Sequence, residues 1–111
     1  MWVDCHTHLN FEGFAKDWRE VVDRAVAAGV EKMIVVGADL ESSQRAVEMT
    51  EQSKHLWASV GIHPHHAKAV TSNQLSVISK QLKELATHKK VVAIGEIGLD
   101  YHVYKNSKYK I

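Results

Sequence analysis

Apolar and polar positions alternate between two patterns along this chain of 111 residues. Apolar residues recur every three or four positions over 14–28, 40–55 and 74–87, which indicates three amphipathic helices. Short apolar runs lie before, between and after them, as expected for strands buried in a sheet. These runs occupy 1–3 (continuing into 4–6), 33–36, 57–61 and 91–96. The predicted order of elements is therefore β-α-β-α-β-α-β.

Start and stop signals flank the predicted helices. Gly29 is well placed to end the first helix, because glycine readily adopts the left-handed conformation found at helix ends. Ser42 or Ser43 can cap the second helix, and Ser72 or Asn73 can cap the third. The three helices are thus separated by short connections.

Strands that alternate with helices of this length predict an α/β fold with a parallel sheet and right-handed crossovers. Four parallel strands form either an open doubly wound sheet or half of a TIM barrel. Residues 103–111 follow neither period, so we expect an irregular tail after a single unit over 1–102.

Composition narrows the class of protein. The chain is 45% hydrophobic and 24% charged, with a formal net charge of +1, so no strong basic field indicates a nucleic-acid partner. Bound metal ions would nevertheless add local positive charge. The single cysteine, Cys5, excludes an internal disulfide and fits a reducing cytoplasm. No apolar stretch is long enough for a signal peptide or a membrane span, so we expect no membrane partner.

Histidines cluster at the ends of two predicted strands. Asp4, His6 and His8 alternate at the end of the first strand, so their side chains are expected on one side of it. Two imidazoles at this spacing can hold one divalent ion, with Asp4 orienting a histidine through its free N–H. A pair of surface histidines in a loop is the alternative, but the position at a strand end favours a metal site.

Two further polar groups follow the third and fourth strands. His63 and His65 lie just after the third strand, where they are either metal ligands, donors to a substrate oxygen, or ordinary loop residues. Glu96 ends the apolar fourth strand, where a buried carboxylate needs a partner or a metal. Asp100 either holds this loop together or supports the site. All three groups lie at the carboxyl ends of parallel strands, which is where α/β folds build their sites.

The three groups resemble the successive signatures of the TatD family of metal-dependent deoxyribonucleases, which are amidohydrolase-like TIM barrels. The resemblance extends from residue 1 to about 102 and rests on the segments Asp4-Cys5-His6-Thr7-His8-Leu9, Gly61-Ile62-His63-Pro64-His65 and Gly95-Glu96-Ile97-Gly98-Leu99-Asp100-Tyr101-His102.

The resemblance implies a role for each matching residue. His6, His8 and Glu96 would bind the metal, and Glu96 would also take part in catalysis by bridging two ions of zinc, manganese or magnesium. His63 and His65 would act as catalytic and substrate-binding residues near the phosphate, with Asp4 and Asp100 behind the ligands. The implied activity is hydrolysis of DNA phosphodiesters, often as an exonuclease, by a metal-activated water.

The resemblance also implies what this chain lacks. A family member is a complete barrel, whose later strands supply two further histidines and an aspartate. Half a barrel leaves two unpaired edges, so we expect that this chain is not a stable monomer. One way to close the barrel is a homodimer of half-barrels that joins the fourth strand of one copy to the first strand of the other. The alternative is a catalytically silent half-barrel that binds metal or self-associates.

Simpler packing roles are expected for other residues. Trp2, Trp18 and Trp57 are predicted to be core or half-buried, and Cys5 is predicted to be a small packed residue facing away from the metal ligands. Lys89 and Lys90 are predicted to form a solvated turn.

Overall fold

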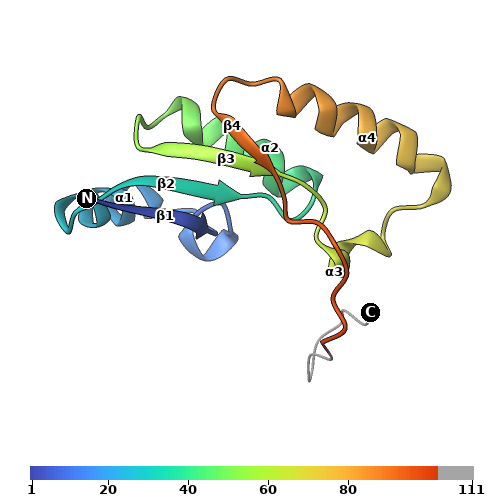
Figure 1. Ribbon diagram of the computed structural model, residues 1–111, viewed down its shortest axis with the longest axis horizontal. Coiled ribbons are helices and arrows are strands. Elements are labelled where there is room, and N and C mark those ends of the chain that lie inside the picture. Colours follow the sequence, from blue (N-terminus) through green and yellow to red (C-terminus); the bar gives the residue numbers. More distant parts are fainter. Residues whose placement is uncertain (103–111) are drawn as a thin grey trace.

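The computed structural model describes residues 1–102, which form a single parallel sheet covered by helices. The strands are β1 (Trp2–Thr7), β2 (Val30–Val36), β3 (Leu56–Val60) and β4 (Val91–Ile94), in the spatial order β1-β2-β3-β4 (Figure 1). All neighbouring pairs are parallel. The predicted α/β fold with four parallel strands is confirmed, whereas the predicted tail over 103–111 lies outside the described residues.

The helices connect consecutive strands, as predicted, with some different bounds. They are α1 (Trp18–Ala27), α2 (Leu40–Glu51) and α4 (Ser72–Ala86). The first is shorter than expected because Glu12–Phe14 forms a separate 3-10 turn, η1. A one-turn helix, α3 (Pro64–Ala67), stands where only a loop was expected, and proline at its first position favours such a start.

The predicted end of α1 is confirmed, whereas the N-caps of α2 and α4 differ from the predicted residues. Gly29 follows α1 with φ +96°, the left-handed conformation that glycine adopts at least cost. Asp39, not Ser42 or Ser43, caps α2: its carboxylate accepts from Ser42 N–H at 2.7 Å. The cap of α4 is Thr71, just before the predicted Ser72 or Asn73. A short polar side chain at the N-cap satisfies a main-chain N–H that the helix leaves open.

The core lies between the sheet and the helices that cover it. β3 contributes fully buried apolar residues, and α2 packs Ala46 against them. Trp18 of α1 joins this core, as predicted, while Trp57 is half-buried with Lys90 Nζ 4.2 Å from its ring. Burial, followed by the charge of Lys89, lowers the pKa of Lys90, so this lysine is not the fully solvated residue that was predicted.

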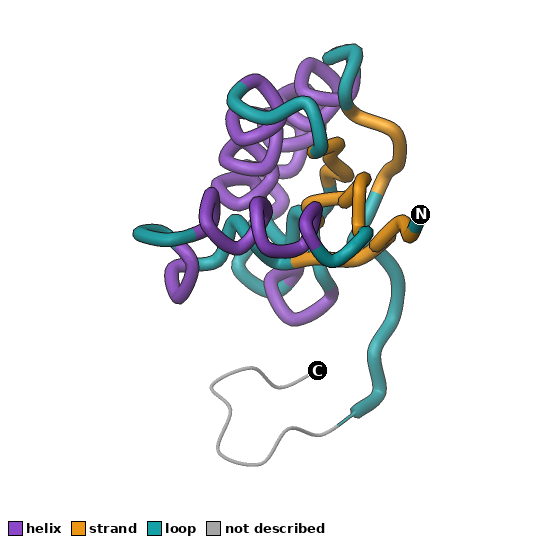
Figure 2. The backbone as a smooth tube through the Cα atoms, turned by 90° about the vertical axis from the view of Figure 1, so that its left-hand side faces the viewer, coloured by secondary structure: helices purple, strands orange, loops and turns teal. Residues whose placement is uncertain are grey.

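The other face of the sheet and its two outer strands are open. Figure 2 shows the helices on one side of the strands only. Trp2 is 72% exposed on β1 and Ile94 is 59% exposed on β4. Trp2 and Cys5 were predicted to pack, but both are exposed, because no described element covers β1 where they lie. None of the helices described is long and apolar enough to cross a membrane.

Candidate metal centre

The candidate metal ligands come from the two outer strands and meet at the carboxyl end of the sheet. His6 lies in β1 and His8 just beyond it, whereas Glu96 lies two residues after β4. The chain after β4 reaches inward, because the main-chain N–H of Glu96 donates to the carbonyl of Gly37, beyond the end of β2, at 2.8 Å. Neighbouring strands lie about 4.8 Å apart, so this inward turn brings Glu96 one strand closer to β1, beside the end of β2.

The donor atoms of the three residues form a compact group. His6 Nε2 and His8 Nε2 are 3.2 Å apart. Glu96 Oε1 lies 3.5 Å from His6 Nε2, and Glu96 Oε2 lies 3.9 Å from His8 Nε2. Ligands bound at about 2.0–2.1 Å in a tetrahedral site are separated by roughly 3.4 Å, so one divalent ion fits among these atoms.

His8 is held and partly desolvated on one side. Its ring stacks on Phe11, with centroids 4.3 Å apart and planes at 26°. Burial is the main cause that lowers the pKa of His8, although the Glu96 carboxylate acts in the opposite direction. A neutral imidazole has a free lone pair, which is the form that binds a metal.

Asp4, which was predicted to orient a histidine, contacts the main chain of His6. Its Oδ1 accepts from the main-chain N–H of His6 at 3.1 Å, rather than from a histidine ring. The register with β2 is also irregular between Asp4 and Thr7. Asp4 can therefore influence His6 through the backbone of β1.

A second group lies beside the first. His63 Nδ1 accepts from the main-chain N–H of His65 at 3.0 Å, and the two ring centroids are 4.4 Å apart. His65 Nε2 and Asp100 Oδ2 are 3.0 Å apart. The donor atoms of all three are close enough to hold a cation. Because Nδ1 of a neutral His63 accepts, its Nε2 carries the proton and can donate to a substrate oxygen.

Comparison with known proteins identifies the family that shares this arrangement. The family described as TatD related DNase matches residues 3–111. The chain belongs to the TatD family. It is 46% identical over 108 residues to YabD of Bacillus subtilis (strain 168), named an uncharacterized metal-dependent hydrolase. It is 40% identical over 100 residues to the 3'-5' ssDNA/RNA exonuclease TatD of Salmonella typhimurium.

These relatives are much longer than this TatD-family chain. The similarity to YabD covers 97% of this chain but 41% of YabD, and the similarity to Salmonella TatD covers 89% and 36%. The solved structure of YjjV, a TatD homolog from Escherichia coli K12, has a TM-score of 0.79 at 34% identity over 92% of this chain and 39% of YjjV. The chain thus spans about two-fifths of its relatives and corresponds to the N-terminal part of their TIM barrels.

The TatD signatures account for the ligands but not for several residues around them. Phe11 was not singled out from the sequence, although an aromatic residue three positions after His8 could have suggested a ring contact. Ser43 was considered only as a helix cap, yet its side chain is fully buried. Asn10 is also buried, where its amide donates to the carbonyls of Val36 and Ser42.

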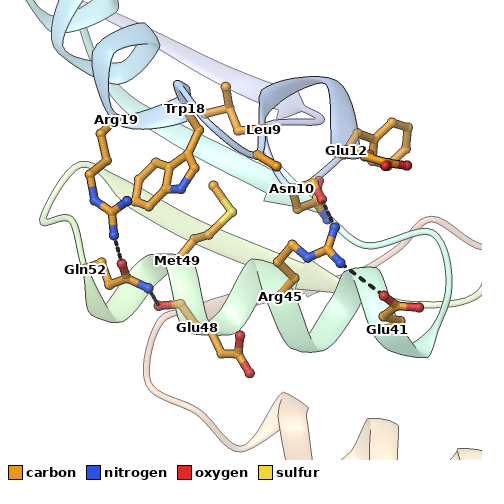
Figure 3. A pocket seen from close by; sticks show the side chains of 12 residues that line it. Leu9, Asn10, Glu12, Trp18, Arg19, Glu41, Arg45, Glu48, Met49 and Gln52 are labelled. Atoms are coloured by element: carbon orange, nitrogen blue, oxygen red, sulfur yellow. Dashed lines mark hydrogen bonds and ion pairs between the residues drawn. The ribbon is translucent and has the colours of Figure 1, made fainter.

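A pocket of about 670 Å³ lies on the helical side of the sheet (Figure 3). Trp18 and Met49 line it from α1 and α2. Arg45 bridges the main-chain carbonyl of Asn10 and the carboxylate of Glu41 at its rim. His6, His8 and Glu96 do not line it, but Phe11 does, and the Phe11 ring stacks on His8, so the pocket borders the candidate metal centre.

Proposed function

We propose that this chain is the N-terminal half, over 1–102, of a metal-dependent hydrolase that cleaves phosphodiester bonds of DNA as an exonuclease. The observation that carries the proposal is the convergence of His6, His8 and Glu96 from opposite edges of the sheet. The name of the Salmonella relative, a 3'-5' ssDNA/RNA exonuclease, supports single-stranded nucleic acid as the substrate class.

The residues of the first group suit a divalent ion. Two imidazoles and a carboxylate are acceptable to zinc and manganese, and less so to magnesium. When bound, such an ion lowers the pKa of a coordinated water and neutralises charge on phosphoryl oxygens. A carboxylate has two oxygens, so Glu96 would be able to bind a second ion in addition to the one shared with His6 and His8. We propose two ions per complete site, with Glu96 as both ligand and catalytic residue.

The residues of the second group, His63, His65 and Asp100, would bind and position the phosphate of the DNA substrate. His63 would bind a non-bridging oxygen through Nε2–H, because its Nδ1 is occupied by the N–H of His65. His65 would assist beside it, with its ring fixed by the contact with Asp100. His63 caps α3 after β3 and His65 lies in that short helix. His63 lies near the first group, since its charge acts on His8. We also propose a cytoplasmic location, because the lone Cys5 is an exposed thiol.

A second candidate function is a silent half-barrel that binds metal without cleaving DNA. The observation in its favour is that the chain spans about two-fifths of its relatives, while β1 and β4 remain as open edges. A site that needs further ligands would then bind an ion but not complete the reaction.

One experiment distinguishes the hydrolase from the silent half-barrel. The chain is incubated with a short end-labelled single-stranded DNA in magnesium, manganese or zinc, beside Glu96→Ala. Glu51→Ala is the matched control, because Glu51 also contacts a histidine, His88 at 3.2 Å, but at the opposite end of the sheet. Metal-dependent cleavage that is lost only in Glu96→Ala supports the hydrolase. A folded chain that binds metal and cleaves nothing supports the silent half-barrel.

A further inference from the structure

A buried serine of α2 contacts the main chain at the ends of two strands. Ser43 is fully buried. Its Oγ accepts from the N–H of Gly61 at 3.1 Å and donates to the carbonyl of the same residue at 3.2 Å. One hydroxyl can make both bonds, because it carries one proton and two lone pairs. Ser43 thereby fixes both polar groups of the peptide backbone just after β3.

The same serine fills a space that Gly37 leaves beside it. A methyl group at Gly37 would overlap Ser43 Oγ and lie 2.8 Å from Ser43 Cα, so the contact requires glycine. Gly37 in turn holds the neighbouring strand ends. Its N–H donates to the main-chain carbonyl of Ser59 at 3.0 Å, and its carbonyl accepts from the main-chain N–H of Glu96 at 2.8 Å.

Gly61, which Ser43 holds, in turn contacts the main chain of Gly95 and Glu96. A methyl group at Gly61 would lie 2.7 Å from the main-chain oxygen of Glu96 and 2.7 Å from the carbonyl carbon of Gly95. The backbone before Glu96 therefore rests directly on Gly61, which Ser43 holds from the other side. Gly95 is attached by one hydrogen bond, from its N–H to Val60 at 2.9 Å.

We propose that Ser43 is a positioning residue for Glu96, acting through Gly37 and Gly61 on the main chain that carries this carboxylate. The inference rests on the proposed function only in taking Glu96 as a metal ligand. Ser43 is available for this role because Asp39 and Ser42 already form the capping box of α2. Glu96 needs such support because it follows the outer strand β4, whose own residues are largely exposed.

Ser43→Ala tests the inference, with Thr50→Ala as the matched control. Thr50 is another buried hydroxyl of α2, but it donates to Val47 of its own helix at 2.6 Å and contacts no strand end in this way. The first readout is amide hydrogen exchange at Gly61 and Glu96. Exchange at Ala58, in the middle of β3, reports general destabilisation, because its N–H donates to the main-chain carbonyl of Lys90.

The second readout is the affinity for Mn²⁺ or Zn²⁺, titrated into folded protein. Ser43→Ala is expected to accelerate exchange at Gly61 and Glu96 at least about tenfold relative to Ala58, and to weaken metal binding by about 10- to 100-fold, as for other residues behind metal ligands. Thr50→Ala is expected to change neither. If Ser43→Ala does not fold, Ser43→Cys replaces it, because a thiol is a weak donor and acceptor. Its exchange rates and metal affinity should lie between those of the wild type and those expected for Ser43→Ala.

The outcomes separate this inference from the proposed function. Equal exchange at Glu96 in Ser43→Ala and Thr50→Ala would overturn the positioning role, whatever the metal affinity. A wild-type chain that binds no metal would overturn the metal assignment of Glu96, while the exchange data would still decide whether Ser43 positions its backbone.

Discussion

Glu96 Oε1 lies 3.5 Å from His6 Nε2, although these residues belong to chain segments at opposite edges of the sheet. Three strand spacings of about 4.8 Å would separate β1 from β4 in a flat sheet. The inward turn after β4, fixed by the bond from Glu96 N–H to the carbonyl of Gly37, removes one of these three spacings, and the side chains of His6 and Glu96 span the rest. The candidate metal centre therefore depends on a main-chain connection across the ends of the two inner strands.

Replacement of Glu96 by glutamine is expected to abolish metal-linked stabilisation. A ligand that binds only the folded chain adds about 2.7 kcal/mol of stability at one hundred times its dissociation constant. Glutamine keeps the size of the side chain but removes the negative charge that attracts the metal ion. Thermal unfolding with and without Zn²⁺ or Mn²⁺ measures the effect. The control Glu51→Gln should retain the full metal-dependent rise, and an equal rise in Glu96→Gln would contradict the assignment.

The convergence of His6, His8 and Glu96 could be predicted from the sequence, because parallel strands end at one edge of a sheet. The alternation of Asp4, His6 and His8 and the polar end of β4 were sufficient for this. The supporting contacts could not be predicted in the same way. The role of Ser43 depends on how α2 sits against Gly37 and Gly61, and sequence spacing does not report that relation.

The incorrect predictions have two physical causes. Trp2 and Cys5 were expected to be packed because apolar side chains in a parallel sheet are normally covered on both faces. Here they lie on an outer strand with no described element over them. The cap of α2 was missed for a different reason, since Asp39 and Ser42 are both good capping residues and only their geometry distinguishes them.

The cap at Asp39 is expected to make stability depend on acid pH. Burial favours a higher pKa, but hydrogen bonds from Ser42 outweigh it, and the charges of His66 and Arg45 add to them, so the pKa of Asp39 is lowered. The stabilisation is therefore fully present above the unfolded value, near 3.8, and is lost as the pH falls through the lower folded pKa.

Two variants separate the charge of Asp39 from its hydrogen bonds. Asp39→Ala should lower the free energy of unfolding by about 1 kcal/mol at neutral pH, as for other lost caps. Asp39→Asn should retain most of the cap but lose this part of the pH dependence. Urea unfolding between pH 3 and 7 provides the measurement, and identical acid profiles for Asp39→Asn and wild type would refute the role of the charge.

Phe11 is expected to keep the His8 ring in place for the metal. The rings are stacked at 4.3 Å, and the N–H of Phe11 donates to the carbonyl of His8 at 3.0 Å. Aromatic pairs contribute about 0.5–1.5 kcal/mol, so Phe11→Ala should weaken metal binding by roughly 2- to 12-fold. Isothermal titration measures this change. Phe14→Ala is the control, because Phe14 is a similarly exposed phenylalanine that has no ring contact with a ligand among the described residues.

The open edges lead to the prediction of a homodimer. A two-fold axis along the barrel would place β4 of one copy beside β1 of the other and close a ring of eight parallel strands. Val92 and Ile94 on β4 and Trp2 on β1 are all more than half exposed in the single chain. Joining the edges would cover apolar surface and satisfy the free main-chain groups of both outer strands.

Sedimentation equilibrium over a range of concentrations tests this arrangement. The wild type is expected to be a dimer, and Ile94→Lys, which places a charge on the joining strand, is expected to weaken association at least about tenfold. Leu75→Lys is the control, since Leu75 is equally exposed but lies on α4, outside the joined edges. A folded monomer at every concentration would rule out the closed pair. Equal weakening by both substitutions would instead show that the copies associate through the helical side.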